Sequence, residues 1–241
     1  MECLNCKTIY EGKFCPECGQ KSETKRFTFQ KITNDTLTTL TNTDKGFFFN
    51  LKYLTLAPGK SINNYLDGKR KQVFNPFSYA LLAIGLYLFV DHYYDFSIFR
   101  SFSNPDNKWR DANIGAYDFG QQIGHFIRKY LKFFYLLNIV YLSLITYLIL
   151  KKRNLVEYLV SNAFIIGHAI IITTVFIPLY KTPIFFNPIT FISIAILMYF
   201  TYKDYEEKIV VFVALFFSIL VSFLLQFIVP GFIIWLKTLI F

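Results

Sequence analysis

The residues best suited to chemistry are four cysteines, which all lie in the first 18 positions of the 241-residue chain. They form two Cys-x-x-Cys pairs, Cys3 with Cys6 and Cys15 with Cys18, and eight residues separate the pairs. Zn²⁺ prefers four soft ligands in a tetrahedron, and each such turn supplies two thiolates from one tight loop. Because four thiolates leave no open position for a catalytic water, the pattern predicts a structural zinc site.

The same cysteine cluster leaves two alternatives open, which are iron in the same cage or a pair of redox dithiols. No His follows either Cys-x-x-Cys pair, which argues against covalent haem attachment. A secreted protein would spread its cysteines as disulfide staples, so the grouping indicates a reducing compartment. We interpret residues 1–20 as a zinc ribbon whose folding depends on the metal, because so short a module has almost no core.

The rest of the chain must hold this ribbon, and its composition indicates a membrane protein. Hydrophobic residues make up 54% of the sequence, in several apolar runs near 20 residues long. We predict an all-α polytopic membrane helix bundle in residues 74–241, with about five spans, the N-terminus inside and the C-terminus outside. The predicted spans are about 77–94, 131–150, 155–178, 184–202 and 209–229. Residues 21–73 form a cytoplasmic amphipathic connector between ribbon and bundle.

The placement of basic residues gives the predicted orientation, because cations beside apolar helices stay on the cytoplasmic side. Two clusters lie next to predicted spans, and they consist of Lys69, Arg70, Lys71, Lys151, Lys152 and Arg153. The net charge of +9 suits an anionic leaflet, and we expect no nucleic-acid partner because the cations cluster at membrane boundaries. Asn75-Pro76 and Asn187-Pro188 are expected to cap and start helices.

Two segments near the predicted outer face are expected to lack a membrane-spanning helix. Residues 95–130 have nearly balanced charges and are predicted to form a polar outside loop. Pro230-Gly231 is expected to kink or end the last span, and residues 232–241 to lie at the interface. Ten residues are too few to cross ~30 Å of hydrocarbon as a helix, so a sixth span is not expected.

The third predicted span carries the most notable polar groups, Glu157, Ser161 and His168. Their spacing places all three within about 40° on one helix face. Ionisable groups inside a span often relay protons or bind a cation, which would suit a small transporter or ion-conducting protein. The alternative is structural: Glu157 would pair with Arg153 near the interface, and His168 would be neutral and bonded to a carbonyl. Polar amides at Asn138, Asn162 and Gln226 are expected to join helices.

A catalytic constellation does not stand out in the sequence. There is no phosphate-cradling glycine loop, no His-Glu-x-x-His and no Gly-x-Ser-x-Gly. The three histidines are scattered, and His92, His125 and Asp95, with Asp91, could form a metal or acid–base site only if the fold brings them together at the outer face. A membrane-embedded enzyme therefore stays an alternative.

The chain resembles a bacterial membrane-protein family of unknown function that has a short N-terminal zinc ribbon and several spans. The resemblance is carried by the two cysteine pairs and by Pro58-Gly59-x-x-Ile62-x-x-Tyr65-Leu66-x-Gly68-Lys69-Arg70, and more weakly by Pro76-x-x-Tyr79 and Glu157-x-Leu159-Val160. It implies no activity. At the level of topology alone, the predicted bundle also resembles the five-span Yip1-type proteins, which act in trafficking.

The leading hypothesis is a non-enzymatic, multi-pass protein of the bacterial inner membrane, with structural Zn²⁺ in a cytoplasmic ribbon. The ribbon would dock a protein partner, and the role would be assembly, scaffolding or regulation.

Overall fold

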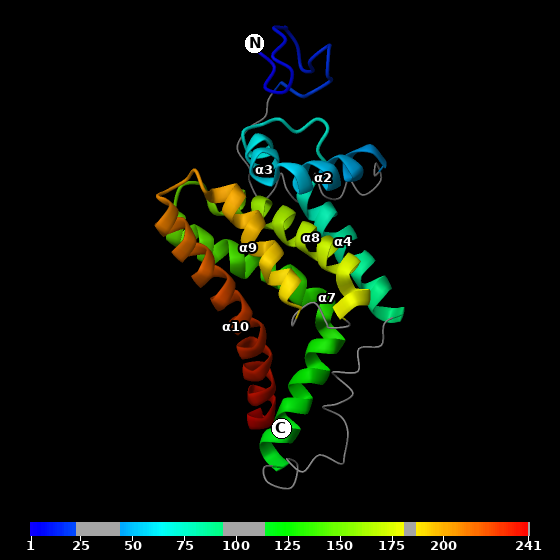
Figure 1. Ribbon diagram of the computed structural model, residues 1–241, viewed down its shortest axis with the longest axis vertical. Coiled ribbons are helices and arrows are strands. Elements are labelled where there is room, and N and C mark those ends of the chain that lie inside the picture. Colours follow the sequence, from blue (N-terminus) through cyan, green and yellow to red (C-terminus); the bar gives the residue numbers. More distant parts are fainter. Residues whose placement is uncertain (23–43, 94–113, 181–186, 241) are drawn as a thin grey trace.

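The computed structural model describes residues 1–22, 44–93, 114–180 and 187–240 of the chain (Figure 1). In this part the protein is helical, apart from isolated bridges in the N-terminal module that pair Glu2 with Ile9 and Phe14 with Lys21. The helices are α2 (Asp44–Leu56), α3 (Pro58–Leu66), α4 (Pro76–Tyr93), α7 (Ile114–Leu150), α8 (Leu155–Tyr180), α9 (Pro188–Tyr202) and α10 (Lys208–Ile240). The predicted all-α class is confirmed.

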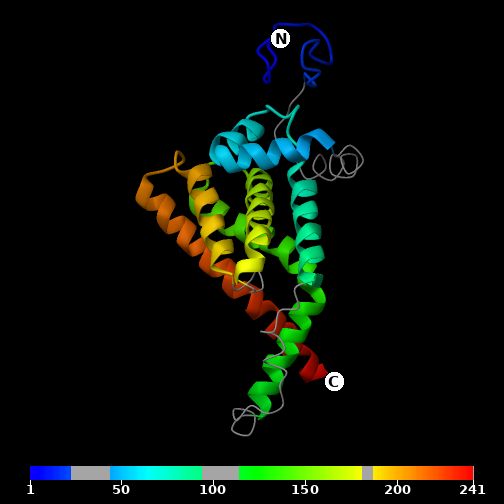
Figure 2. The same ribbon diagram turned by 45° about the vertical axis from the view of Figure 1, so that its right-hand side comes forward.

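Helix α8 is the centre of the bundle, and Figure 2 shows it between α4 and α9. It packs against α4, α7 and α9, and 83% of its apolar segment is buried, compared with 28% for α10. Small residues allow the α4–α8 contact to be close: a Cβ on Gly167 would lie 2.9 Å from the Cα of Ala80. Close backbone approach over small residues is typical of helix pairs in membranes.

Three helices are long and apolar enough to cross a membrane, over Phe133–Leu150, Leu155–Leu179 and Lys208–Leu225. These match the second, third and fifth predicted spans, so three candidate spans are found among the described residues. The helix at the fourth prediction, α9, is apolar but has only 15 residues. The first, α4, has 18 residues but does not meet the same measure of apolarity.

The structure differs from the sequence-based expectation in two segments. Helix α7 begins at Ile114, so the second half of the predicted 95–130 loop is helical, with a local break at Tyr130 (φ −110°, ψ 16°). No proline lies between 114 and 150, and charge balance reports the side of a membrane rather than the backbone conformation. Helix α10 continues past Pro230-Gly231 to Ile240, so of the two expected outcomes, a kink or an end, the end is not found. A proline within a long helix removes a hydrogen bond but need not end the helix.

The predicted helix starts are confirmed by their caps. The Oδ1 atom of Asn75 accepts hydrogen bonds from the N–H groups of Phe77 (2.9 Å) and Ser78 (3.3 Å) at the start of α4. The Oδ1 atom of Asn187 accepts one from Ile189 (3.0 Å) at the start of α9. Residues 181–186 lie outside the described part, so the expected start at 184 is not tested.

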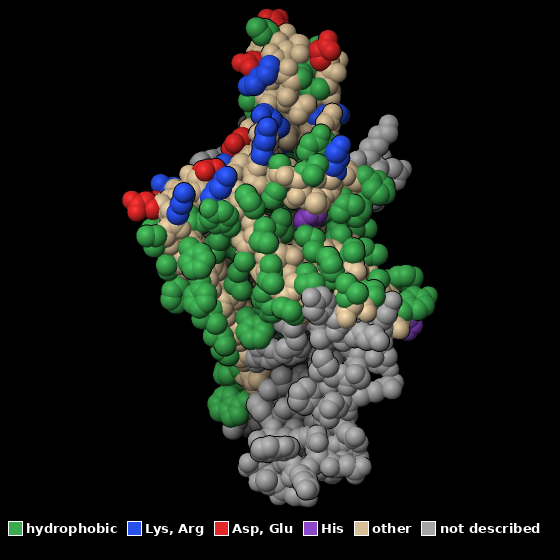
Figure 3. All heavy atoms as spheres, viewed as in Figure 1, with side chains coloured by type: hydrophobic (Ala, Val, Ile, Leu, Met, Phe, Trp, Pro, Cys, Tyr) green, Lys and Arg blue, Asp and Glu red, His purple; other side chains and the backbone are tan. Residues whose placement is uncertain are grey.

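Charged side chains gather at one end of the molecule in the view of Figure 3, where α2 and α3 lie across the bundle below the N-terminal module. The described surface directly below this end shows mainly hydrophobic side chains in the same view. This division between a charged end and an apolar body agrees with a protein that is partly embedded in a bilayer.

Candidate metal centre and buried polar groups

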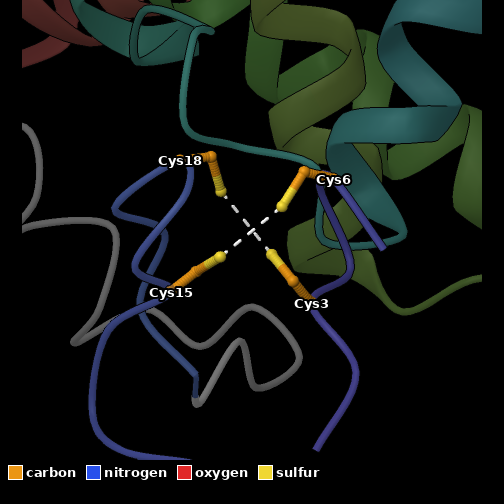
Figure 4. A group of neighbouring side chains, drawn as sticks. All are labelled: Cys3, Cys6, Cys15 and Cys18. Carbon is orange, nitrogen blue, oxygen red and sulfur yellow. Dashed lines mark hydrogen bonds between the residues drawn. The ribbon is translucent and has the colours of Figure 1, made fainter. Parts of the chain in front are cut away.

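The structure brings the four predicted ligands together, as Figure 4 shows for Cys3, Cys6, Cys15 and Cys18. Their Sγ atoms all lie within 4.8 Å of one another, with 3.6 Å between Cys3 and Cys18 and 3.5 Å between Cys6 and Cys15. Four thiolates bound at ~2.3 Å to one Zn²⁺ would be about 3.8 Å apart in a tetrahedron, so the residues fit such an ion.

The two cysteine loops have the same backbone design. The N–H of Lys7 donates to the carbonyl of Cys3 (2.9 Å), and the N–H of Gly19 donates to that of Cys15 (2.8 Å). Both residues have positive φ, 69° and 67°. Glycine adopts positive φ readily at Gly19, and Lys7 adopts the same conformation in the first loop, where a non-glycine residue is less favoured.

The four thiols are not electrostatically equivalent. Hydrogen bonds from the side chain and backbone of Thr8 lower the pKa of Cys6 to about 6, and the two side-chain atoms lie 3.2 Å apart. Burial raises the pKa of Cys15 to about 11. A buried thiol of this kind ionises when a bound cation compensates its charge, so metal binding would release protons.

The cysteine module is attached to the bundle through Gln20, whose buried Oε1 atom accepts a hydrogen bond from the backbone N–H of Arg70 (3.1 Å). A Cβ on Gly19 would lie 3.3 Å from the Nζ atom of Lys71. The second cysteine loop therefore also approaches the segment between α3 and α4. The module therefore rests on the turn between α3 and α4.

The first basic cluster, Lys69 to Lys71, follows α3 and contacts the C-terminal end of that helix. Arg70 donates from Nε to the carbonyl of Tyr65 (3.1 Å), and its guanidinium lies 5.6 Å from the centre of the Tyr65 ring. The Nζ atom of Lys69 donates to Asn64 Oδ1 (3.0 Å), while Lys71 is exposed. Cations near the carbonyl end of a helix are favourable, so two of the three predicted membrane-surface cations also have an intramolecular role.

The second basic cluster joins three segments at the same end of the bundle. Arg153 forms an ion pair with Asp67 (2.9 Å) and donates to the hydroxyl of Tyr205 (2.7 Å). Burial acts to lower the pKa of Arg153, but the bonds to Asp67 and Tyr205 outweigh it and raise the pKa. Lys152 pairs with Glu206 (2.9 Å), and Lys151 is exposed.

Tyr205 continues this network into α3. Its hydroxyl donates to Asn63 Oδ1 (2.9 Å), and the Nδ2 atom of Asn63 donates to the carbonyl of Thr201 (3.0 Å). The turns before α8 and α10 and the connector helix α3 are thus tied to one another.

Glu157 caps the start of α8. The N–H of Asn154 donates to its carboxylate (3.1 Å), and the N–H of Glu157 donates to Asn154 Oδ1 (2.7 Å), which is a reciprocal capping box. The structure shows an ion pair of Arg153 with Asp67 and gives Glu157 this cap. Ser161 donates back along the helix to the carbonyl of Glu157 (2.7 Å).

His168 joins three helices. Its Nδ1 atom lies 2.8 Å from the hydroxyl of Tyr79 on α4, and its Nε2 atom lies 3.2 Å from Thr55 Oγ1 on α2. Thr55 donates its own proton to the carbonyl of Leu51 (2.7 Å). Thr55 therefore accepts from Nε2–H, and Nδ1 accepts from Tyr79, so both ring nitrogens of a neutral imidazole are satisfied.

The three predicted polar residues of α8 are spread along the helix. Along a helix, 11 residues separate Glu157 from His168 by about 16 Å, and each has its own partners. Sequence reasoning missed Thr55 as a partner of His168, whereas Tyr79 stands in the Pro76-x-x-Tyr79 motif noted above.

The expected role of Asn162 is confirmed, because it bonds Ser143 on α7 (3.1 Å) and Tyr202 on α9 (3.1 Å). The side-chain oxygen of Asn138 is buried and has no partner among the described atoms, so the same expectation fails there. The side chain of Gln226 lies outside the described set.

The proposed outer-face site is only partly within the described residues. His92 is exposed near the end of α4, with its ring 5.9 Å from that of Tyr93, and Asp91 accepts a hydrogen bond from Tyr87 (3.1 Å). Asp95 and the side chain of His125 lie outside the description, so their approach to His92 is not tested.

Gly59 explains the most specific motif of the connector. A Cβ at this position would lie 1.9 Å from the carbonyl oxygen of Phe200, so only glycine permits α3 to meet α9 here. Pro58 occupies the first position of α3, and Gly68 has a φ of 105° just after the helix ends. The motif therefore specifies a helix docked across the end of α9.

A known protein family matches the chain in this same region. Residues 44–88, which comprise α2, α3 and most of α4, match a family described as a protein of unknown function, DUF3667. The match covers 45 of 241 residues and does not reach the cysteine module. No curated protein and no solved structure matches the chain. The resemblance to a family of unknown function is confirmed over that segment.

Proposed function

We propose that this chain is a multi-pass protein of the bacterial inner membrane that acts as a scaffold, assembly factor or regulator through a cytoplasmic zinc ribbon. The observation that carries this proposal is the set of four facing thiols in a module attached to the charged end of the bundle. Four thiolates saturate Zn²⁺, so the metal would shape a docking surface and would not perform catalysis.

The hydrogen-bonded turns support a five-span arrangement. The turns before α8 and before α10 meet the end of α3 through Arg153, Asp67 and Tyr205, so they lie at one end of the bundle. Helices α4, α7, α8, α9 and α10 then run alternately away from and towards that end (Figure 1). The cysteine module and the C-terminal end of α10 lie at opposite ends, as an odd number of passes requires.

The two weaker spans have a structural reason to be less apolar. Helix α4 packs on α8, and α9 packs on α3, α8 and α10, so much of their surface meets protein and not lipid. An 18-residue helix is ~27 Å long, which is close to the ~30 Å hydrocarbon core. The 15 residues of α9 reach only ~22 Å, so its crossing would use flanking residues.

Exposed apolar side chains on the ribbon support a protein partner. Ile9 is 83% exposed and Phe14 is 60% exposed, while the small core of the module consists of Cys3, Tyr10 and Cys15. Such residues on a metal-fixed loop present a rigid apolar surface, which suits protein recognition.

The transporter alternative receives less support, because the polar groups of α8 are engaged in structural hydrogen bonds. Glu157 caps its helix, and both ring nitrogens of His168 have partners on other helices. A proton or cation path would need these groups to be available to water or substrate.

The test compares Cys15→Ser, Phe14→Ala and Lys13→Ala in the full chain. We expect Cys15→Ser to lose bound zinc and a partner that is cross-linked to the ribbon in cells, and Phe14→Ala to keep zinc but lose the partner. Lys13→Ala should keep both. Reporters fused after residue 241 should lie outside the cytoplasm. Retention of the same partner by all three variants, or a cytoplasmic C-terminus, would contradict the proposal.

A further inference from the structure

A cavity of about 900 Å³ lies where the corner between α2 and α3 meets α8 and α9. Its exposed charged lining residues are Lys60, Lys203 and Asp204. Apolar side chains of α9, including Ile196 and Phe200, form one wall. The volume lies within the ~300–1,000 Å³ range of small-molecule sites.

The α9 wall changes character along its length. Ser193, Ile196, Phe200 and Lys203 line the cavity at spacings of three and four residues, so they share one helix face. From Ser193 to Lys203, about 15 Å along the helix, the lining passes from a hydroxyl through apolar groups to a cation. A ligand that matches this wall is amphipathic.

We propose that the cavity binds one membrane glycerophospholipid, with its phosphodiester between Lys60 and Lys203 and an acyl chain along Ile196 and Phe200. This inference rests on the membrane placement proposed above and is independent of the metal module. Lysine binds phosphate as a point charge, and neither cation forms an ion pair with a described residue.

Two further features favour a lipid over a free phosphate ion. Ile196 is 50% exposed and Phe200 is also exposed, so this wall is open on the apolar body of the protein, where acyl chains would lie. The apolar side chains of Leu54, Leu56 and Ile172 line the same cavity and can contact an acyl chain. Inorganic phosphate would use only the charged rim.

The charge pattern of the rim bears on the headgroup. Asp204 adds one negative charge beside the two lysines. A zwitterionic phosphoethanolamine group would place its phosphate at the lysines and its ammonium at Asp204, whereas a phosphoglycerol group would use the lysines alone. Both are phosphodiesters, and the test separates them.

The first experiment measures lipid that stays bound to the full chain after purification in mild detergent. Native mass spectrometry and extracted phosphorus per chain are compared for the wild type, Lys60→Glu/Lys203→Glu and the control Lys52→Glu, an exposed cation of α2 outside the cavity. We expect the double variant to bind phospholipid about tenfold more weakly, as loss of charged hydrogen bonds implies, and the control to resemble the wild type.

The second experiment fills the cavity with a matched pair on α9. Ile196→Trp adds bulk at the cavity wall, whereas Ile192→Trp adds the same bulk at a residue that is 57% exposed and does not line it. We expect only Ile196→Trp to lose retained lipid. Zinc content and elution volume, which neither substitution should change, show that each variant is folded, so failure here is separate from failure of the metal proposal.

The third experiment identifies the source of the phosphate. Short-chain phosphatidylethanolamine, short-chain phosphatidylglycerol and inorganic phosphate are added separately to delipidated protein, and the melting temperature is recorded. A rise with one or both lipids and none with inorganic phosphate supports the proposal. Equal rises with all three, or equal lipid retention by all charge and tryptophan variants, would overturn it.

Discussion

The cysteine module and the helix bundle are stabilised by different means. The module has three buried core residues, Cys3, Tyr10 and Cys15, two of which are metal-ligand candidates. The bundle has a continuous apolar core that extends from Leu54 to Leu215. The comparison teaches that one chain can combine a unit that depends on a bound ion with a unit that depends on packing, joined at the Gln20–Arg70 contact.

Removal of the metal should give the largest difference in stability between the module and the bundle. Because structural Zn²⁺ contributes ~10 kcal/mol or more to the folding of such small modules, a strong chelator should unfold residues 1–22 while the bundle stays folded. Hydrogen exchange should show lost protection in the module and unchanged protection in α8. Equal loss of protection in α8 would contradict the separation.

Substitution of Gly59 tests how far the stability of the bundle depends on close packing between α3 and α9. Gly59→Ala places a Cβ 1.9 Å from the carbonyl of Phe200, so α3 must move, and we expect a loss of about 3 kcal/mol in stability. Gly85→Ala on α4 is the control, because a Cβ there meets nothing within 4 Å. It should be neutral or stabilising by ~0.5–1 kcal/mol.

The measurement for this pair is the free energy of unfolding in detergent, together with zinc content. Gly59→Ala should lower stability without releasing zinc. If both glycine variants behave alike, the close approach of α3 to α9 does not govern stability.

The His168 hydrogen bonds should have a smaller effect. Tyr79→Phe removes one donor to Nδ1, and we expect a cost of about 1–2 kcal/mol, since the buried imidazole loses its partner. Thermal unfolding in detergent reports the change. In proteoliposomes, Tyr79→Phe and His168→Ala should not alter proton or cation flux, and loss of a measurable flux in folded His168→Ala would restore the transporter hypothesis.

The contact between the two units should contribute least. Gln20→Ala removes its bond to Arg70 and should cost ~0.5–1.5 kcal/mol at most. The main result should be a wider distribution of distances between spin labels on the module and on α9. An unchanged distribution would show that other contacts hold the module in place.

The sequence was sufficient where a structure is made from neighbouring residues. The cysteine spacing identified all four clustered thiols, and Asn75-Pro76 and Asn187-Pro188 identified the starts of α4 and α9. The spacing of Asn154 and Glu157 also contains the capping-box signal. The functional hypothesis for Glu157 gave weight to its membrane position and so overlooked this local explanation.

Features that depend on distant segments could not be obtained in the same way. Thr55 and His168 are 113 residues apart, and no local pattern indicates that they meet. The need for glycine at position 59 arises from a carbonyl on α9. Helix α10 continues through Pro230-Gly231, whereas the sequence left open whether these residues would kink or end the helix.

The ties of α3 have a consequence for biosynthesis. The partners of Asn63 are Thr201 and Tyr205, which are synthesised 138 and 142 residues later. The partner of Asp67 is Arg153, which is synthesised 86 residues later. While the ribosome completes the chain, the surface of α3 around Gly59 and Asn63 lacks these later contacts with α9. A chain that stalls before α9 is inserted therefore keeps this surface available to chaperones and proteases, so the docking of α3 marks a completed molecule.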